Sequence, residues 1–461
     1  MWTIEQIAQV VGGQVHQPDL TRKIAGYSVD SRCLNAGELF IALSGEHTDG
    51  HLFLREAFQR GASGALVRQI PPSLVGRLHN LVQVPDTGKA LRQLATAYRR
   101  QWNMPVVGIT GSSGKTTTKE LIHALASQDY KTYRSPGNYN TEIGHPIALL
   151  NMPDETEVGI FELALQRPGE IRTLCDIAQP TIGVLTSIGD AHLGFFQNRE
   201  ELARAKWELI ESLAPNGLAV LNFDAPYLAL WAKKLRARVV GFGIESKRAM
   251  VRAEHICDDQ LAGVAFEVLT SQERFRVCPQ LLGRANVYNI LAAVAVALEL
   301  GVDRANIQKA LADFKPVPHR LELLRSLRFG LIVDDSYNAN STSVKEALQI
   351  LARMRVPYRK IFVFGDMLEL GDFSVELHRE LAGVIQELGI DQVFTLGELA
   401  RETASALRRQ AAWTSKRAIC TSNLKELKEH LVKELHDDQN LILVKGSRGM
   451  RLDQIVQTLM A

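Results

Sequence analysis

Short apolar runs of strand length alternate with longer segments of helical pattern along nearly the whole chain. This alternation favours α/β layering around mostly parallel sheets, because successive parallel strands need a crossover connection that is usually a helix. No internal repeat or low-complexity tract stands out. The length of 461 residues corresponds to about three domains at roughly 150 residues each. The sequence therefore predicts a multidomain α/β protein.

Two proline-containing segments mark the expected domain boundaries. The first lies at Asn103 to Pro105 and leaves a small α/β domain at residues 1–103. The second, Lys315 to Pro318, is a stiff connector with two prolines. Between them, residues 104–316 are expected to form a larger α/β domain. Residues 317–461 are expected to form a doubly wound, Rossmann-like α/β domain.

The composition excludes several classes of protein. The chain has 53 Lys and Arg against 51 Asp and Glu, so a net charge of +2 provides no field that would attract nucleic acid or an acidic membrane. The five cysteines are widely spaced and never form a C-x-x-C pair, which argues against a disulfide framework or a cysteine-based zinc site. The longest apolar run, Ile290 to Leu298, is far below the roughly 18 residues that span a bilayer. At the N-terminus, Thr3 and Gln6 indicate a capped helix, and no basic signal-peptide region precedes it. We expect a cytoplasmic monomer with no nucleic-acid partner and no membrane insertion.

The strongest chemical signal lies between Val106 and Glu120. A hydrophobic strand enters a turn of small residues and a helix follows, so backbone N–H groups and the positive helix end converge on one point. Lys115 can reach phosphate oxygens, and the Thr116 hydroxyl can ligate the magnesium ion that phosphates bring. The strict pattern G-x-x-x-x-G-K-[ST] is not met, because Gly108 lies one residue too far upstream, but the core T-G-x-x-G-K-T-T matches. We therefore assign phosphate binding to Thr110, Gly111, Ser112, Ser113, Gly114, Lys115, Thr116 and Thr117.

The alternative to a phosphate site is a tight strand-to-helix turn with an incidental lysine. A nucleotide site alone also does not distinguish a nucleotide-dependent switch, a motor and an enzyme. The N-K-x-D element of guanine-specific switches is absent from the sequence. The run Leu331 to Asp335 resembles the strand and aspartate that hold magnesium in motor ATPases. However, it lies more than 200 residues downstream, in a different expected domain. The motor hypothesis is therefore weakened.

Several segments together resemble the Mur ligases, which build the peptide of the bacterial cell-wall precursor. In chain order these are Thr110–Thr117, Gly137–Gly144, Asp190–His192 and Ala205–Lys206. Three more resemble the branch of the family that adds D-alanyl-D-alanine to UDP-N-acetylmuramoyl-tripeptide, namely Asp334–Asn340, Gly365–Gly371 (G-D-M-L-E-L-G) and Lys445–Gly449. The resemblance covers essentially the whole chain, and the D-N-P-R segment of the diaminopimelate-adding relatives is missing.

The resemblance implies a mechanism. Such a ligase transfers the γ-phosphoryl group of ATP to the substrate carboxylate, and the amine then attacks the acyl phosphate, which releases ADP and phosphate. Charge neutralisation and positioning dominate the first step. By family match, Lys115 would offset phosphate charge, and Thr116 with Glu162 would hold the first magnesium ion. His192 would contact a second ion, and Lys206 would become an anionic oxygen ligand after carbamylation by CO2.

The residues alone leave the last two roles open. A histidine like His192 caps a turn or contacts substrate about as often as it binds a metal. Lys206, between Arg204 and Glu208 on a predicted helix, is by pattern a solvated surface lysine. The resemblance also implies that Asn286 and Arg320 contact ATP and that Asp335 is catalytic. Arg320 and Asp335 would reach the nucleotide only when the domains close. An ordinary linker arginine and a turn-capping aspartate are the alternatives for those two.

The resemblance assigns the substrate side to two regions. In the first domain, Ser31, Arg32 and Gly45 belong to segments similar to a uridine-diphosphate dock, where a hydroxyl and a cation suit a doubly charged group; a bland surface turn is the alternative. The remaining substrate contacts are expected at Asn138, Tyr139, Asn140, Thr141 and Asn338.

Some positions depart from the family pattern. Leu163 to Arg167 replace a common Gly-Ala-Asn-His stretch, Thr141 stands where asparagine is common, and His319 replaces a usual glycine beside Arg320. Because no phosphate or magnesium group is lost, we expect activity. The alternatives are a sister ligase that adds a single amino acid, a folylpolyglutamate synthase, and a nucleotide switch or non-catalytic nucleotide-binding relative. No segment identifies the third residue of the tripeptide as diaminopimelate or lysine.

Overall fold

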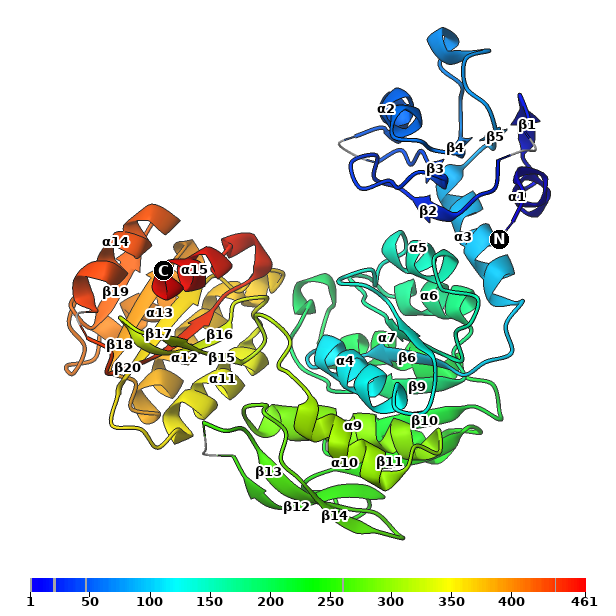
Figure 1. Cartoon of the computed structure of the whole chain (residues 1–461). Helices are drawn as coiled ribbons and strands as arrows, with labels where there is room; N and C mark the ends of the chain where they lie inside the picture. Colours follow the sequence, from blue (N-terminus) through cyan, green and yellow to red (C-terminus); the bar gives the residue numbers. More distant parts are fainter. Residues whose placement is uncertain (1, 20–21, 46–47, 259–260, 436) are drawn as a thin grey trace.

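Three β-sheets, each covered by helices, organise the chain (Figure 1). The computed structural model describes residues 2–19, 22–45, 48–258, 261–435 and 437–461. The expected α/β class and the predominance of parallel pairing are confirmed. The boundaries at 103/104 and 316/317 stay predictions.

The N-terminal sheet is parallel except for its edge strand β1, which pairs antiparallel with β5. Its strand order is β1 (Gln14–His16), β5 (Leu81–Gln83), β4 (Gly64–Val67), β3 (Glu38–Ile41) and β2 (Gly26–Ser28). Its helices are α1 (Ile4–Val11), α2 (Leu54–Gln59) and α3 (Thr87–Arg99). The predicted capping box of Thr3 and Gln6 is present, and Gly12 ends α1 in the left-handed conformation.

The central sheet has nine strands, and the last two, β13 and β14, are antiparallel additions at one edge. Its order is β14 (Arg274–Val277), β13 (Ala265–Leu269), β12 (Val251–Cys257), β11 (Arg238–Gly243), β10 (Leu218–Asn222), β9 (Ile182–Leu185), β6 (Val106–Thr110), β8 (Val158–Glu162) and β7 (Thr132–Arg134). The helices are α4 (Lys115–Ala126), α5 (Gly144–Leu150), α6 (Glu170–Ala178), α7 (Arg199–Glu211), α8 (Leu228–Trp231), α9 (Arg284–Glu299) and α10 (Arg304–Asp313).

The C-terminal sheet is parallel except for β15, which pairs antiparallel with β16. Its order is β15 (Glu322–Ser326), β16 (Gly330–Asp335), β20 (Asn440–Lys445), β17 (Arg359–Gly365), β18 (Gln392–Leu396) and β19 (Ala418–Thr421). The helices are α11 (Ser341–Arg353), α12 (Ser374–Glu387), α13 (Glu398–Arg408), α14 (Leu424–Glu434) and α15 (Asp453–Met460).

The apolar run Ile290 to Leu298 lies within α9, where most side chains are buried because the helix packs on the central sheet and against α4. A helix that is apolar all round is typical of a core position. Within the described part of the chain, no helix has the length and apolar character required to cross a membrane.

The N-terminal and central sheets share one hydrophobic core, which contains residues of α1, α3, α5, α6 and α7. Helix α3 carries polar contacts across the junction: the Tyr98 hydroxyl donates to Met152 O (2.9 Å), and Arg99 Nε donates to Ala178 O (2.7 Å). The Asn151 side chain pairs with both backbone groups of Tyr27, accepting at 2.9 Å and donating at 2.8 Å. These contacts fix the N-terminal sheet to the central sheet.

One core residue of α5 carries a stability cost. His145 is fully buried with its ring edge-on to Phe161, and neither ring nitrogen has a hydrogen-bond partner among the described residues. Burial lowers the pKa of His145 to about 3. Below pH about 6.5, the pKa of a histidine in an unfolded chain, His145 binds a proton in the unfolded state but not in the folded state. Stability should therefore fall by about 1.4 kcal/mol per pH unit as the pH drops from about 6.5 toward 3.

We expect His145→Leu to raise the midpoint of thermal unfolding at neutral pH, because an unpaired buried polar group destabilises the folded state by about 1–3 kcal/mol. The variant should also lose less stability at acidic pH. His378 is a matched control: it is equally buried, but Nε2 accepts from Met367 N (3.0 Å) and Nδ1 contacts Ser374 O (2.6 Å). His378→Leu should therefore lower the midpoint. Thermal scans at pH 7.5 and 5.5 test both variants. Destabilisation by His145→Leu at both pH values would contradict the prediction.

Candidate active site

The phosphate loop lies where three adjacent parallel strands end. β6 runs between β9 and β8, and their carboxyl ends deliver Thr110, Thr186 and Glu162 to the same edge of the sheet. In open α/β sheets, ligands bind outside this edge, where the connections diverge to the two faces.

Two glycines of the loop permit close contacts that a larger residue would prevent. A Cβ atom on Gly111 would lie 2.0 Å from Thr186 Oγ1. Gly114 has φ +84°, and a Cβ there would lie 2.2 Å from Asn289 Oδ1 on α9. The Thr186 hydroxyl donates to Ser113 O (2.6 Å), and the Ser112 hydroxyl donates to Gly189 O (3.1 Å). The loop is therefore held by its neighbours, with the N-terminus of α4 facing the cavity described below.

Lys115 and Thr116 begin α4. The Lys115 ammonium donates to Gly111 O (2.8 Å), across the loop that it closes. Burial lowers the pKa of Lys115, and Arg320 adds to this effect, while the nearby Glu162 opposes it. The position beside the helix N-terminus suits a group that neutralises phosphate charge.

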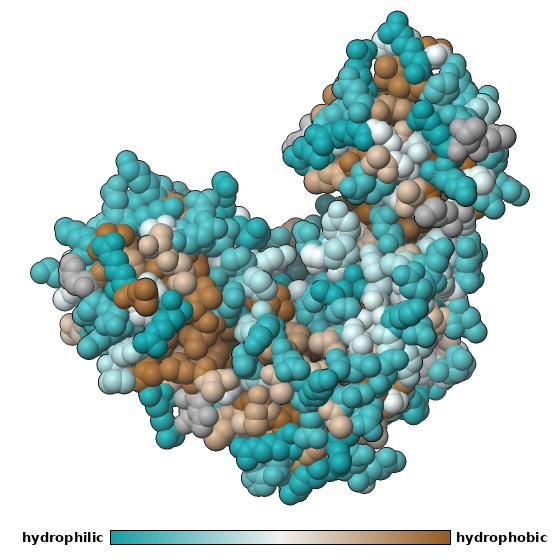
Figure 2. Space-filling model, in the orientation of Figure 1, coloured by the Kyte–Doolittle hydropathy of each residue, from teal (hydrophilic) through white to brown (hydrophobic). Residues whose placement is uncertain are grey.

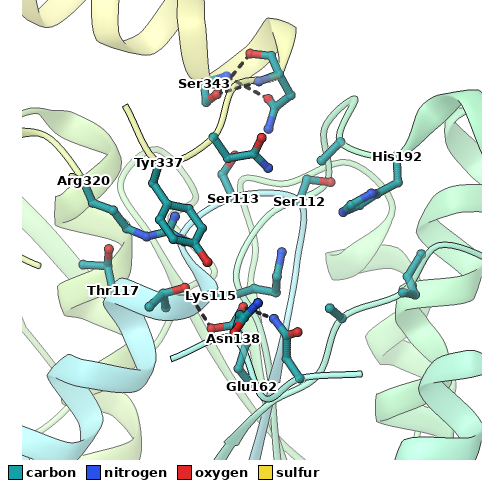
Figure 3. Close-up of a pocket in the computed structure, with 18 of the residues that line it drawn as sticks. Ser112, Ser113, Lys115, Thr117, Asn138, Glu162, His192, Arg320, Tyr337 and Ser343 are labelled. Carbon is teal, nitrogen blue, oxygen red and sulfur yellow. Dashed lines mark hydrogen bonds between the residues drawn. The ribbon is translucent and has the colours of Figure 1, made fainter. Parts of the chain in front are cut away.

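Glu162 joins the phosphate loop to the loop after β7. The Thr116 hydroxyl donates to Glu162 Oε2 (2.8 Å), and Asn140 Nδ2 donates to Glu162 Oε1 (2.9 Å) (Figure 3). The carboxylate is 4% exposed. No cluster of three or more His, Cys, Asp or Glu side chains that could bind a metal occurs in the described ranges. One hydroxyl and one carboxylate nevertheless fit magnesium, which takes few protein ligands and completes its shell with water and phosphate oxygens.

A cavity of about 560 Å3 lies between the central and C-terminal sheets (Figures 2 and 3). It brings together most of the residues that the sequence predicted for ATP, metal and peptide. These are Ser112, Ser113, Gly114, Lys115, Thr116, Thr117, Asn138, Asn140, Thr141, Glu162, His192, Asn286, Arg320, Asp335 and Asn338. The remaining four do not line the cavity: Thr110 and Gly111 begin the loop, Tyr139 is exposed, and Lys206 is buried.

Arg320 enters the cavity from the connector after α10. Its guanidinium lies 4.2 Å from the ring centre of Tyr337, an aromatic contact that the sequence analysis missed. His319 has φ +63°, which explains why glycine is common at this position. The histidine is accommodated because its Nδ1 lies 2.8 Å from the buried carboxylate of Asp334.

Asp335 ends β16 and does not act as a simple turn cap. Its carboxylate forms an ion pair with Lys445, whose ammonium also donates to Asn338 O (3.0 Å). Burial raises the pKa of Asp335, and Lys445 opposes the rise. Glu346 on α11 lines the same cavity, and burial raises its pKa to about 7. Neither Glu346 nor the pairing of Lys445 was predicted from the sequence, although a lone lysine at the end of the apolar run of β20 is a usable signal.

Lys206 is not a surface lysine. It lies on α7 with 1% of its surface exposed, and no acidic side chain of the described residues forms an ion pair with it. Burial lowers the pKa of Lys206 well below its usual range, and the positive charge of Lys115 adds to the effect. The neutral amine is the form that reacts with CO2, so the environment fits a carbamate.

His192 precedes a short 3-10 helix, η3 (Leu193–Phe195), and has φ +67°. Its Nδ1 atom lies 2.6 Å from Glu369 Oε2 of the C-terminal domain, although the contact lacks the alignment of a good hydrogen bond. Burial lowers the pKa of His192, and Glu369 opposes this effect. A neutral imidazole in the cavity wall is a competent metal ligand.

The expected uridine-diphosphate residues lie in the N-terminal domain, outside the cavity. The Ser31 hydroxyl donates to Glu56 Oε2 (3.0 Å), and the exposed Arg32 makes a bidentate pair with Asp30 (2.9 and 2.7 Å). Gly45 N donates to Thr48 O (2.8 Å). An exposed arginine held by a carboxylate can exchange that partner for a phosphate group at low cost.

A further lysine supports the loop at which peptide contacts are expected. Lys119 is fully buried one turn beyond Lys115, and its ammonium donates to Ser135 O (2.8 Å) and Gly137 O (3.3 Å). It thereby holds the start of the loop that carries Asn138 and Asn140. The spacing of four residues on one helix face was a signal that the sequence analysis did not use.

Comparisons with known proteins match most of the chain. Sequence profiles match at residues 23–99 (Mur ligase family, catalytic domain), 109–297 (Mur ligase middle domain) and 319–448 (Mur ligase, glutamate ligase domain). The chain is 34% identical over 458 residues to the UDP-N-acetylmuramoyl-tripeptide–D-alanyl-D-alanine ligase of Bacillus subtilis (99% of this chain, 98% of the relative). The enzyme of the same name from Escherichia coli is 33% identical over 460 residues (99% and 98%).

Solved structures give the same result. A crystal structure of MurF from Acinetobacter baumannii superposes with a TM-score of 0.88 at 30% identity, covering 100% of this chain and 98% of that one. MurF ligase from Thermotoga maritima in complex with ADP superposes with a TM-score of 0.81 at 30% identity (95% and 97%). With three profiles along most of its length and relatives that align from end to end, the chain belongs to the Mur ligase family.

Proposed function

We propose that the chain is an ATP-dependent ligase that joins D-alanyl-D-alanine to UDP-N-acetylmuramoyl-tripeptide, giving the UDP-N-acetylmuramoyl-pentapeptide of peptidoglycan synthesis, ADP and phosphate. The observation that carries the proposal is the single cavity in which Lys115 and Glu162 of the central domain face Arg320 and Asp335 of the C-terminal domain. The names of the full-length relatives support the choice of substrates.

The reaction has two steps. The tripeptide carboxylate attacks the γ-phosphorus of ATP, the bond to the bridging oxygen breaks, and ADP leaves. The dipeptide amine then attacks the acyl carbon, the bond to phosphate breaks, and the amine loses a proton. Lys115 and the amide groups at the start of α4 stabilise negative charge in the first step, while Arg320, stacked on Tyr337, supplies a cation from the C-terminal domain.

Magnesium would be held by Thr116 and Glu162, with His192 and carbamylated Lys206 as ligands of a second ion, and it would supply Lewis-acid neutralisation of phosphate charge. The chemistry of these donors supports the proposal: two hard oxygens lie in contact, and burial lowers the pKa of His192 and of Lys206, which favours their neutral forms. For the UDP end we propose Ser31, Arg32 and Gly45. For the peptide we propose Asn138, Tyr139, Asn140, Thr141 and Asn338. A monomer in the bacterial cytoplasm, which the separate cysteines favour, stays a prediction.

Phosphate release tests the proposal. The protein is incubated with ATP, UDP-N-acetylmuramoyl-tripeptide and either D-alanyl-D-alanine or single amino acids. We expect release only with the dipeptide, at about 10 turnovers per second, the median for enzymes. Release with a single amino acid would support the sister ligase, and no release with any acceptor would support a non-catalytic relative. Parallel runs with diaminopimelate and lysine tripeptides identify the preferred third residue.

A further inference from the structure

The central and C-terminal domains touch closely at the loop after β9. A Cβ atom on Gly189 would lie 2.9 Å from Thr342 Oγ1 at the start of α11. A Cβ on Gly194 would lie 2.4 Å from Gly371 N, at the beginning of the 3-10 helix η5 (Gly371–Phe373). At the second point the backbones of the two domains are in contact.

Glu369 is the centre of this second contact. It belongs to the G-D-M-L-E-L-G segment, which none of the roles assigned above explains. Its backbone carbonyl accepts from Gly194 N (3.0 Å), and its Oε2 atom lies 2.6 Å from His192 Nδ1. His192 is the main cause of a lowered pKa of Glu369, and Gln166, in the segment that departs from the family pattern, adds to the lowering.

The backbone of the contact is strained on both sides. Glu369 has φ +64° and His192 has φ +67°, a conformation that residues with side chains rarely adopt. Such strain persists only where the surroundings determine the conformation, and it gathers at functional sites. Two strained residues that face each other across a domain boundary therefore indicate a built contact.

The contact also connects to the phosphate loop. The Ser112 hydroxyl donates to Gly189 O (3.1 Å) and accepts from Gly189 N (2.8 Å), three residues before His192. A carboxylate close to one ring nitrogen of a histidine favours a proton on that nitrogen and leaves the other nitrogen for a ligand. Glu369 lies at this distance from Nδ1, and a small rotation of either side chain would align the hydrogen bond.

We propose that Glu369 is a positioning residue that clasps His192 when the C-terminal domain closes, so that the orientation of His192 in the cavity depends on the position of the domain that brings the acceptor. The clasp consists of Glu369, His192, Gly194 and Gly371. It rests on the proposed function only for the identity of the acceptor and for the ligand role of His192.

Small-angle scattering of the full chain tests closure independently of turnover. Its radius of gyration is measured with and without a non-hydrolysable ATP analogue, for the wild type, Glu369→Ala, Glu369→Gln and Gly194→Ala. Gly194→Ala inserts a methyl group between the two backbones and leaves both clasp side chains in place. Glu376→Ala is the matched control, because Glu376 is an exposed glutamate seven residues further on, in the first turn of α12.

We expect Glu369→Ala and Gly194→Ala to lose the analogue-induced compaction, and Glu369→Gln, which keeps an acceptor oxygen, to retain about half of it. In the ligase assay, KM for D-alanyl-D-alanine should rise about tenfold for Glu369→Ala, with the affinity for the UDP-tripeptide unchanged. Compaction and KM within twofold of the Glu376→Ala control would overturn the clasp and leave an ordinary surface ion pair. A wild type that compacts without ligating the dipeptide would instead overturn the proposed function.

Discussion

Lys115→Ala should lower the rate of acyl-phosphate formation by about a thousandfold, because the ammonium at the start of α4 contacts the phosphate loop directly and lines the cavity. The loss of one preorganised group of this kind costs about 10²–10³ in rate. Binding of the UDP-tripeptide should stay largely intact, because its proposed dock lies in the N-terminal sheet. Single-turnover release of ADP measures the first quantity, and titration calorimetry measures the second.

Lys309→Ala is the control for Lys115→Ala, since Lys309 is an exposed lysine on α10, away from the cavity. It should retain wild-type rates. Equal turnover by Lys115→Ala and Lys309→Ala would contradict the assignment of Lys115 to phosphate binding. A parallel loss of UDP-tripeptide affinity would show that the substitution had disturbed the fold.

Lys206→Ala should be inactive and should regain part of its activity with added formate or acetate. The side chain is buried without an acidic ion-pair partner among the described residues, and burial lowers its pKa, which favours the neutral amine that carbamylation requires. A small carboxylate could replace the oxygens of the proposed carbamate in the space that alanine leaves. We expect a loss of about a hundredfold or more, the effect typical of removing a group that stabilises transition-state charge. Steady-state phosphate release across a series of carboxylates is the measurement.

Two further variants are compared with Lys206→Ala. Lys206→Arg keeps a cation that cannot be carbamylated, so it should be inactive and should not respond to carboxylates. Lys233→Ala removes an exposed lysine from the same domain and should behave like the wild type. Full activity in Lys206→Ala would show that Lys206 has no catalytic role. Rescue by chloride as effective as rescue by acetate would contradict the carbamate hypothesis.

The phosphate loop could be predicted from sequence because its determinants are contiguous. A strand, a turn of small residues and a helix that starts with Lys115 fix the geometry almost alone, and β6 and α4 occur where the pattern placed them. The strands β9, β10, β16, β17, β18 and β20 carry a comparable signal, because apolar runs bounded by turn residues indicate buried parallel strands.

The hairpin strands β12 to β14 were not predicted, although their burial alternates along each strand, as expected for a sheet with one solvated face. Period-two alternation over four to seven residues is a weak signal. The contact of Glu369 with His192 joins positions far apart in the chain, so only the tertiary structure shows it. The burial of Lys206 could not be predicted from the sequence either. Charged residues such as Arg204 and Glu208 lie nearby on α7, and tertiary packing rather than the local pattern decides which side of the helix is covered.

The shared core of the first two sheets has a consequence for substrate choice. Because Tyr98, Arg99 and Asn151 hold the N-terminal sheet on the central sheet, the span from Arg32 to Lys115 is set by packing. In the proposed function, the uridine diphosphate binds at Arg32 and the peptide carboxylate reacts beside Lys115, so the two sheets would fix the distance between the two ends of the substrate. A peptide shorter than the tripeptide would leave its carboxylate out of reach of the γ-phosphate, so the chain would select its substrate by length before any side chain was read.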